Sequence, residues 1–339
     1  MDTGLKRATM ADVAVEAGVS RALVSLVYRQ PEKVSPERRA RVHAAAERLG
    51  FRPNWVASSL SAYKGSFIGI LVSNLHNPLF ATIVDTVRTE LDGAGRYGLM
   101  SSAVIQDRDG TFRSDRRIVQ AFEDLNASAL LVVGVTPDVS ELETLRPDLP
   151  IVVAAASIEE LPRAVSVRSD SEVGMRTVVD HLVSLGHTHI VHLGGGGGPA
   201  SRHRSEAYAN AMRERGLEDY IHIESAEFDE QSGHAAARRV FTARPDTTAL
   251  TCVNDLVAIG AMGAATERGL RIPADVAITG YDNTFLAGID AIGLTSVDTE
   301  AEEIGRLAAA WLAGEDTMPA PGTEVLVPPL LVVRRSTQA

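Results

Sequence analysis

The stretch Thr9-Met-Ala-Asp-Val-Ala-Val-Glu-Ala-Gly-Val-Ser20 decides the fold of the N-terminal part of the chain. Thr9 and Asp12 have the spacing of a capping box, which predicts a helix that begins just after Thr9. Gly18 predicts the end of that helix, because glycine adopts the positive φ that a sharp turn between two helices requires. Ser20 can then cap a second helix, so the pattern is typical of a helix-turn-helix.

The residues that follow extend this pattern to three helices. Leu23, Val24 and Val27 form the buried stripe of the second helix. A third helix begins at Ser35-Pro36-Glu37, where a cap, a proline in the first turn and an acid stand together, and it ends near Gly50. The alternative is a three-helix bundle that contacts other proteins.

The distribution of charge favours a nucleic-acid partner for this part of the chain. The whole chain has a net charge of −11, but residues 1–64 contain 11 lysines and arginines against 6 acids, a net of +5, which leaves −16 for the rest. A short basic head on a long acidic body is expected when only the head binds polyphosphate. The basic residues expected on its surface are Arg21, Arg29, Lys33, Arg38, Arg39, Arg41, Arg48 and Arg52.

The second helix is expected to enter the major groove with its N-terminal side chains on the base edges. On that geometry Arg21, Ala22 and Leu26 are the exposed readers. Arg21 can donate two hydrogen bonds to guanine, whereas Ala22 and Leu26 offer only apolar contact, for instance with thymine methyls. Ser20, Ser25 and Arg29 are expected nearer the phosphates.

After Pro53 a short segment, Asn54-Trp-Val-Ala-Ser-Ser-Leu60, predicts one or two turns of helix capped by Asn54. An isolated helix below about 12 residues is marginally stable in water. We therefore expect this segment to fold only on DNA or against a second copy of the chain.

From Phe67 onward short apolar runs alternate with amphipathic helical stretches, which predicts parallel sheets with helices on both faces. The repetition is too long for one sheet, so two α/β subdomains across a cleft are expected. The predicted strands are Phe67–Val72, Gly98–Val104, Ala129–Val135, Ile151–Ala156, His189–Leu193, Ala249–Val253 and Val276–Tyr281.

Several motifs together resemble the lactose-repressor (LacI) family of transcriptional regulators. In the head they are Thr9–Ser20, Leu23-Val-Ser25, Val34-Ser-Pro-Glu37 and Leu49-Gly-Phe-Arg-Pro-Asn54. In the body they are Asn77-Pro78, Asp170, Leu185-Gly-His187, Asn254-Asp255 with Gly260, Gly280-Tyr-Asp282 and Val327-Pro-Pro329.

The resemblance implies an all-α helix-turn-helix head and a hinge helix, followed by an α/β domain with the two lobes of periplasmic binding proteins. The implied limits are 1–53 for the head and 54–66 for the hinge and linker. The N-terminal lobe then comprises 67–165 plus 296–323, and the C-terminal lobe 166–295 plus 324–334.

The resemblance also implies a repressor that binds a palindromic operator as a homodimer and responds to a small-molecule effector. It adds Thr9, Asn54, Ala57 and Leu60 to the expected DNA contacts, with Leu60 matching the leucine that wedges into the central minor-groove step and kinks the DNA. Plain packing of Leu60 between two copies is the alternative. Leu26 stands where many members have arginine, so base preference does not carry over.

Effector residues are expected beyond the carboxyl ends of the strands, where ligands bind in open α/β sheets. The candidates can stack on apolar ring faces or bond to oxygen atoms. They are Asn77, Phe80, Arg202, Phe228, Asn254 and Asp282. As alternatives, Asn254 caps the following helix and Asp282 binds turn amides.

Four positions depart from the sugar-binding members of the family. Ala155 and Ala156 stand where those members usually have Asp-Arg, Ser171 replaces a common asparagine, and Thr299 stands where glutamine is frequent. Without the acid and the arginine the strong contacts to sugar hydroxyls are lost. This weakens the case for a hexose and leaves a less polar ligand, a phosphorylated or aromatic metabolite, or no ligand open.

Two other classes of function have weaker support. Gly194–Gly198 follows a predicted strand and suggests the nucleotide-binding loop of an enzyme. The signal is weak, because five consecutive glycines satisfy almost any glycine pattern. His187, His189 and His192 suggest a metal, yet they lack the spacing of a ligand set and are expected at the surface or at helix caps. A single cysteine, Cys252, excludes a disulfide framework.

A solute receptor for a transporter is the other alternative, and the missing export signal and the basic head oppose it. No apolar run is long enough to span a bilayer. We therefore expect a cytoplasmic regulator that is not an enzyme, with no cofactor, no metal and no membrane partner.

Overall fold

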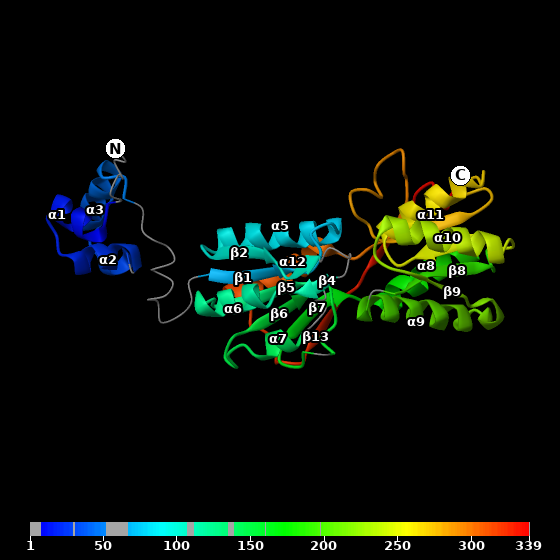
Figure 1. Ribbon diagram of the computed structural model, residues 1–339, viewed down its shortest axis with the longest axis horizontal. Helices are drawn as coiled ribbons and strands as arrows, with labels where there is room; N and C mark the ends of the chain where they lie inside the picture. Colours follow the sequence, from blue (N-terminus) through cyan, green and yellow to red (C-terminus); the bar gives the residue numbers. More distant parts are fainter. Residues whose placement is uncertain are drawn as a thin grey trace. The chain divides into compact units, whose positions relative to one another are not determined.

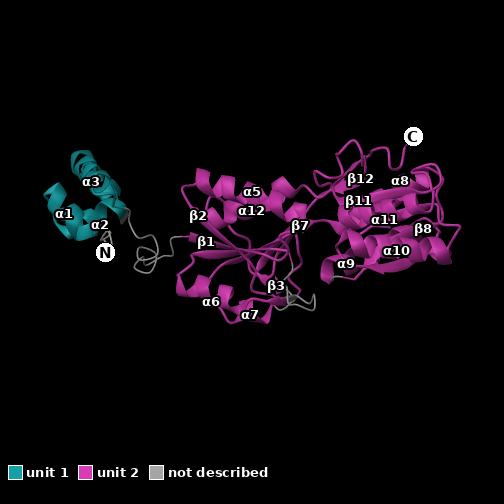
Figure 2. Ribbon diagram, turned by 45° about the horizontal axis from the view of Figure 1, so that its top comes forward, with its two compact units in different colours: residues 1–64 teal, residues 65–339 magenta. Residues whose placement is uncertain are grey.

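The computed structural model describes residues 8–29, 31–51, 67–106, 112–134, 139–159, 161–196 and 198–338. The chain divides into two compact units, residues 1–64 and 65–339, which are coloured separately in Figure 2. The predicted hinge helix, with Asn54, Ala57 and Leu60, lies outside the described residues.

The first unit contains the three predicted helices, α1 (Met10–Ala17), α2 (Arg21–Arg29) and α3 (Pro36–Arg48), with a short 3-10 turn, η1 (Pro31–Lys33). The predicted capping box is confirmed: Asp12 N donates to Thr9 Oγ1 at 3.3 Å, and Thr9 N donates to Asp12 Oδ2 at 2.8 Å. Gly18 has the expected positive φ of 62°. The start and the end of α1 therefore follow from local signals in the sequence.

Helix α2 begins at its predicted cap, because Leu23 N donates to Ser20 Oγ at 3.2 Å. Ser35 makes no side-chain cap to α3, where Pro36 occupies the first turn instead. The helices pack on a small core of buried side chains: Val13, Ala14, Ala17, Val24, Val27, Val34, Val42, Ala45 and Ala46.

The second unit holds two six-stranded sheets, each the centre of one lobe (Figure 1). The first sheet has the order β13-β7-β6-β5-β1-β2 and is entirely parallel. The second has the order β14-β12-β11-β10-β8-β9, with only β14 antiparallel to its neighbour. Mostly parallel order is confirmed for both lobes.

The elements of the first lobe are β1 (Phe67–Val72), α5 (Pro78–Gly93), β2 (Tyr97–Ser102), β3 (Val104–Gln106), β4 (Phe112–Ser114), α6 (Arg116–Asp124), β5 (Ala129–Val133), α7 (Ser140–Glu143), β6 (Ile151–Ala154), β7 (Val165–Ser169), α12 (Ala301–Ala313) and β13 (Glu324–Val327). Helices α5 and α12 lie side by side over one face of its sheet, and α6 and α7 cover the other (Figures 1 and 2). The apolar strands β1, β5 and β6 are therefore covered on both faces.

The elements of the second lobe are α8 (Ser171–Ser184), β8 (Ile190–Gly195), α9 (Pro199–Glu214), η2 (Glu218–Tyr220), β9 (Ile223–Ala226), α10 (Glu230–Ala243), β10 (Ala249–Cys252), α11 (Asp255–Glu267), β11 (Ala277–Asp282), β12 (Thr295–Asp298) and β14 (Leu330–Val332). One core lies between the sheet and α10 with α11, and a second lies between the sheet and α8 with α9. Each face of this sheet thus has its own helix pair.

The chain crosses between the lobes three times, after β7, after β12 and after β13. The lobe limits expected at 165, 295 and 323 are corrected here. Residues 166–169 pair within the first sheet, 296–298 within the second, and 324–327 beside β7 in the first. The difference arises because each crossing segment completes its strand before it leaves the sheet.

Among the described helices, none combines the length and the apolar character needed to cross a bilayer.

Candidate functional site

Of the three residues of α2 that are predicted to contact base edges, two are exposed and one is not. Arg21 and Ala22 are exposed at the N-terminal end of the helix, opposite the buried Val24 and Val27. Leu26 differs from its prediction as an exposed reader, because it is half-buried and packs against the core of the head. At 100° per residue it lies at the edge of the exposed arc, beside the core-facing side of the helix.

The residues of the head that are predicted to contact phosphates differ in exposure and in their contacts within the protein. The Ser20 hydroxyl accepts the first cap bond of α2, and Ser25 is half-buried. The Thr9 hydroxyl is engaged in the capping box. The side chain of Arg29 lies outside the described part of the chain.

Two of the predicted surface cations hold the head together. Arg41 Nη2 donates to the carbonyl oxygens of Ala17 at 2.6 Å and Gly18 at 3.3 Å, which satisfies the C-terminal end of α1. Arg48 Nε lies 3.0 Å from Glu16 Oε1. Both arginines are exposed and also make contacts within the head.

A narrow pocket lies between the two lobes of the second unit. Both lobes and the crossings between them contribute to its wall. Its lining residues are Leu79, Ala155, Ala156, Ser157, Arg168, Ser169, Ser171, Ala200, His203, Arg204, Thr299 and Ile304.

All four departures from the sugar-binding pattern line this pocket: Ala155, Ala156, Ser171 and Thr299. The lining contains no carboxylate and no amide side chain. Carboxylate and amide groups are the usual partners of sugar hydroxyls, since they accept and orient several hydrogen bonds at once. The wall of the pocket is therefore poorly suited to a polyol.

None of the six predicted effector residues is among the lining residues, and two of them, Asn77 and Asn254, cap helices instead. Asn77 Oδ1 accepts from Leu79 N at 3.0 Å and caps α5. Asn254 caps α11 through Val257 N at 2.9 Å, and its amide donates to the carbonyl oxygen of Phe228 at 3.2 Å. The capping interpretation of Asn254 is thus confirmed.

Phe80 and Phe228 are half-buried and pack against the cores of their own lobes. Arg202 is half-exposed and pairs with Glu159 of the first lobe, with Arg202 Nη2 2.9 Å from Glu159 Oε2. Of the six candidates, Asn254 and Phe228 are in direct contact, and Arg202 lies next to the pocket-lining His203.

Asp282 lies directly behind the pocket, where it binds a residue that the sequence analysis missed. Arg204 Nη2 donates to Asp282 Oδ1 at 3.2 Å, and Arg204 Nη1 donates to the carbonyl oxygen of Val253 at 2.5 Å. The guanidinium also stacks over the ring of Tyr281, 3.8 Å from its centroid. Burial raises the pKa of Asp282 to about 7, although Arg204 opposes that rise.

The signal for Arg204 was present in the sequence as a helical stripe. Ser201, Arg204, Ser205, Tyr208 and Met212 are all buried on one side of α9. An arginine on an otherwise apolar or small-residue stripe needs a buried acceptor. That acceptor, Asp282, is 78 residues further along the chain.

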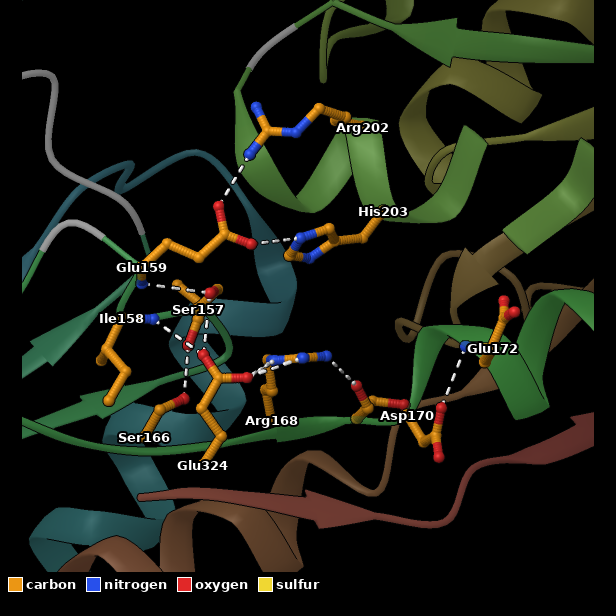
Figure 3. A network of polar contacts seen from close by, with 12 residues as sticks. Ser157, Ile158, Glu159, Ser166, Arg168, Asp170, Glu172, Arg202, His203 and Glu324 are labelled. Atoms are coloured by element: carbon orange, nitrogen blue, oxygen red, sulfur yellow. Dashed lines mark hydrogen bonds and ion pairs between the residues drawn. The ribbon is translucent and has the colours of Figure 1, made fainter. Parts of the chain in front are cut away.

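A second group of polar contacts surrounds the pocket on the side of the first lobe (Figure 3). Arg168 donates to Glu324 Oε2 through Nε at 3.1 Å and Nη2 at 2.8 Å, and Glu324 Oε1 accepts from Ser157 and from Ile158 N. These contacts tie β7 to β13 where two of the crossings leave the first sheet.

The three histidines do not form a metal site, and no group of three or more possible metal ligands occurs among the described residues. His192 is fully buried, which corrects its expected place at the surface or at a helix cap. It stacks on Tyr208, its Nδ1 lies 2.9 Å from Thr251 Oγ1, and burial lowers its pKa to about 3. His192 is thus a neutral core side chain.

Comparison with known proteins finds one family model within each of the two units. Residues 9–54 match the family described as bacterial regulatory proteins, lacI family, and residues 179–337 match a periplasmic binding protein-like domain. The regulator DegA of Bacillus subtilis is 28% identical over 339 residues, covering 98% of this chain and 98% of its own. The regulator GalR of Escherichia coli is 29% identical, covering 97% of this chain and 95% of its own.

The fold also matches solved structures over nearly the whole chain. A crystal structure of the lac repressor dimer bound to operator and the anti-inducer ONPF has a TM-score of 0.80 and 26% identity, covering 98% of this chain and 100% of that one. The match includes both the helical head and the two-lobed unit.

Proposed function

Because the chain belongs to the lacI family of bacterial regulatory proteins, we propose that it represses transcription by binding a palindromic operator as a homodimer, under the control of a small molecule bound between its lobes. The observation that carries this is the first unit, a helix-turn-helix whose second helix has Arg21 and Ala22 exposed at its N-terminal end. That end of a recognition helix meets the base edges in the major groove.

In this proposal Arg21 reads guanine and Ala22 contacts a thymine methyl. Ser20, Ser25, Arg29 and Thr9 lie towards the phosphates, and Leu26 contributes apolar contact from the edge of the helix. Asn54, Ala57 and Leu60 bind in or near the minor groove, with Leu60 as the wedge. These assignments follow the family resemblance and the orientation of α2.

The homodimer brings two heads onto adjacent half-sites, since the symmetry of the protein matches that of a palindrome. The second unit offers apolar surface for pairing. Tyr97 on the edge strand β2 is 65% exposed, and Phe285 in the loop after β11 is 72% exposed. Exposed apolar side chains on an edge strand call for a covering partner.

The switch in this proposal is a movement of one lobe against the other about the three crossings. A ligand that binds better to one arrangement shifts the population towards it, with a coupling of about 1–3 kcal/mol in typical systems. The movement would change the spacing of the two hinge segments and with it the affinity for the operator.

We place the protein in the cytoplasm, where operator DNA is found, and assign it no catalytic activity. Its relatives are transcriptional regulators, which supports this placement. A solute receptor or a nucleotide-dependent enzyme would not require the helix-turn-helix.

Selection from a pool of randomised duplexes tests the proposal directly. The full-length chain should enrich a palindrome with two half-sites at low ionic strength, and the affinity should fall steeply as salt increases. Residues 65–339 alone, which contain both sheets, are the control and should enrich nothing. Absence of any sequence preference in the full-length chain, with and without a metabolite extract, would overturn the proposal.

A further inference from the structure

The pocket between the lobes has an unusual balance of side chains. Three basic residues, four hydroxyl residues and five apolar residues line it, without any acid. All charged side chains in this wall are basic, so the pocket disfavours cationic ligands and favours anionic ones. The apolar share points to a ligand with a short hydrocarbon body.

Arg204 is the basic residue with hydrogen-bonding capacity left over. It is 8% exposed, and two of its nitrogens are engaged by Asp282 and by the carbonyl oxygen of Val253. Its Nε is buried and has no hydrogen-bond partner among the described residues. A buried charged donor without an acceptor costs free energy, so an acceptor supplied by a ligand at this position is favourable.

Thr299 presents a second orphaned group to the same pocket. Its side chain is 2% exposed, and its Oγ1 has no partner within the described part of the chain. It stands in the crossing that leads into α12 of the first lobe, whereas Arg204 belongs to α9 of the second. A ligand that engages both residues would therefore join the two lobes.

Two long helices begin at this pocket without a side-chain cap. Helix α9 starts beside the lining residue Ala200, and α12 starts just after Thr299. The first amides of a helix carry partial positive charge and favour an anion. Arg204 and the two helix ends thus reinforce one another.

The other two basic residues are already neutralised by carboxylates outside the lining. Arg168 makes two bonds to Glu324, and His203 Nε2 lies 2.7 Å from Glu159 Oε1. Arg204 also has a carboxylate partner, Asp282, but burial raises the pKa of that carboxyl to about 7, so the charge of Arg204 is the least fully balanced of the three. This suits a singly charged carboxylate better than a doubly charged phosphate group.

We propose that the pocket binds a small organic acid, whose carboxylate accepts hydrogen bonds from Arg204 Nε and Thr299 Oγ1 and whose hydrocarbon body packs on Leu79, Ala155 and Ile304. The proposal deepens the proposed function and rests on it, since it names the class of effector for the same cleft.

Thermal unfolding of the full-length chain tests this with simple probes at constant ionic strength. Butyrate and benzoate should raise Tm in a concentration-dependent way, because a ligand that binds only the folded chain stabilises it. Butyramide and benzamide, which match them in shape without the charge, should have little effect, and so should inorganic phosphate.

Two variants connect the binding to the proposed contacts. Thr299→Val keeps the shape and removes the hydroxyl, so the Kd for the carboxylate should rise about tenfold. Arg204→Lys keeps the charge and removes the Nε donor, and it should weaken binding similarly if it folds. Thr266→Val, on the exposed side of α11, is the matched control and should bind as the parent does.

The outcomes separate cleanly. Equal stabilisation by the amides, stabilisation by phosphate alone, no stabilisation by any probe, or unchanged binding in Thr299→Val would each overturn the assignment of an organic acid. Operator selection with the same preparations reports on the proposed function independently. Sequence-specific DNA binding without carboxylate binding would remove the ligand class only.

Discussion

Glu159 of the first lobe is paired with Arg202 of the second, with Oε2 and Nη2 2.9 Å apart (Figure 3). The same carboxylate contacts His203 through its other oxygen, so one acid holds two neighbouring residues of α9. Both Glu159 and Arg202 are half-exposed, and ion pairs of this kind contribute about 1 kcal/mol or less. The pair therefore adjusts the balance between open and closed lobes without deciding it alone.

Replacing Glu159 by Gln should shift that balance towards the open arrangement. We expect a larger radius of gyration in small-angle X-ray scattering and a ligand affinity lower by up to about fivefold, the equivalent of 1 kcal/mol. Glu172→Gln is the control, because Glu172 bonds to Asn210 within the second lobe. An unchanged scattering profile and affinity in Glu159→Gln would show that the pair does not hold the lobes.

Replacing Arg21 by Ala should relax base preference at one position of each half-site, since a bidentate contact to guanine discriminates by about 1–3 kcal/mol. The measurement is selection from randomised duplexes. Arg48→Ala is the control, because Arg48 is paired with Glu16 and should leave the selected sequence unchanged. An identical profile for Arg21→Ala and the parent would contradict the reader role.

Stability should depend on pH through Asp282. Burial raises its pKa in the folded chain from 3.8 to about 7, so the folded state keeps a proton that the unfolded state has lost. The resulting stabilisation is complete below about pH 4 and is lost as the pH rises through 7. We therefore expect the free energy of unfolding to fall between pH 5 and pH 8.

Urea unfolding across that range checks this prediction. Asp282→Asn should reduce the slope, and a residual slope should remain because burial also raises the pKa of Asp255, to about 6. Asp275→Asn is the control, since its exposed carboxyl has a pKa lowered to about 2 by Arg271 and is ionised throughout. A slope that is the same in all three chains would contradict the prediction.

Phe285→Lys should weaken the homodimer. The ring is 72% exposed in the single chain, and burying an aromatic residue at an interface commonly contributes 2 kcal/mol or more, about thirtyfold in Kd. Sedimentation measures the dissociation constant, and operator affinity should fall with it. Leu185→Lys, exposed at the end of α8, should remain dimeric; equal behaviour of the two variants would remove Phe285 from the interface.

The head could be predicted from sequence because its signals are local. Thr9 and Asp12 are three residues apart, Gly18 acts through its own φ, and Ser20 caps the helix that follows it. Each interaction closes within one turn, so no knowledge of the distant chain is needed.

The completing strands of the two sheets could not be predicted in the same way. β7, β12 and β13 are four or five residues long, which is too short for a pattern of apolar and polar residues to identify a strand. They become strands because a partner far along the chain pairs with them, as β13 does with β7. Tertiary pairing of this kind leaves little trace in a short window of sequence.

The sequence predicts where the candidate site lies but not which residues line it. The cleft at the carboxyl ends of the strands was expected, and the four departures from the sugar-binding pattern proved to line it. The polar side chains of Asn77 and Asn254 predict ligand contacts, whereas in the structure they cap helices. Arg204 was missed because its buried acid, Asp282, is 78 residues further along the chain, and because its cleft forms only when the two lobes are assembled.

The third crossing has a consequence for how the protein is made. β13 and β14, only three residues apart, are the last strand of one sheet and the last strand of the other. A growing chain on the ribosome can assemble residues 8–51 early, but the first lobe lacks its full sheet until Val327 has been synthesised and the second lobe until Val332. A translation product interrupted before that point would carry the head without a finished sensor.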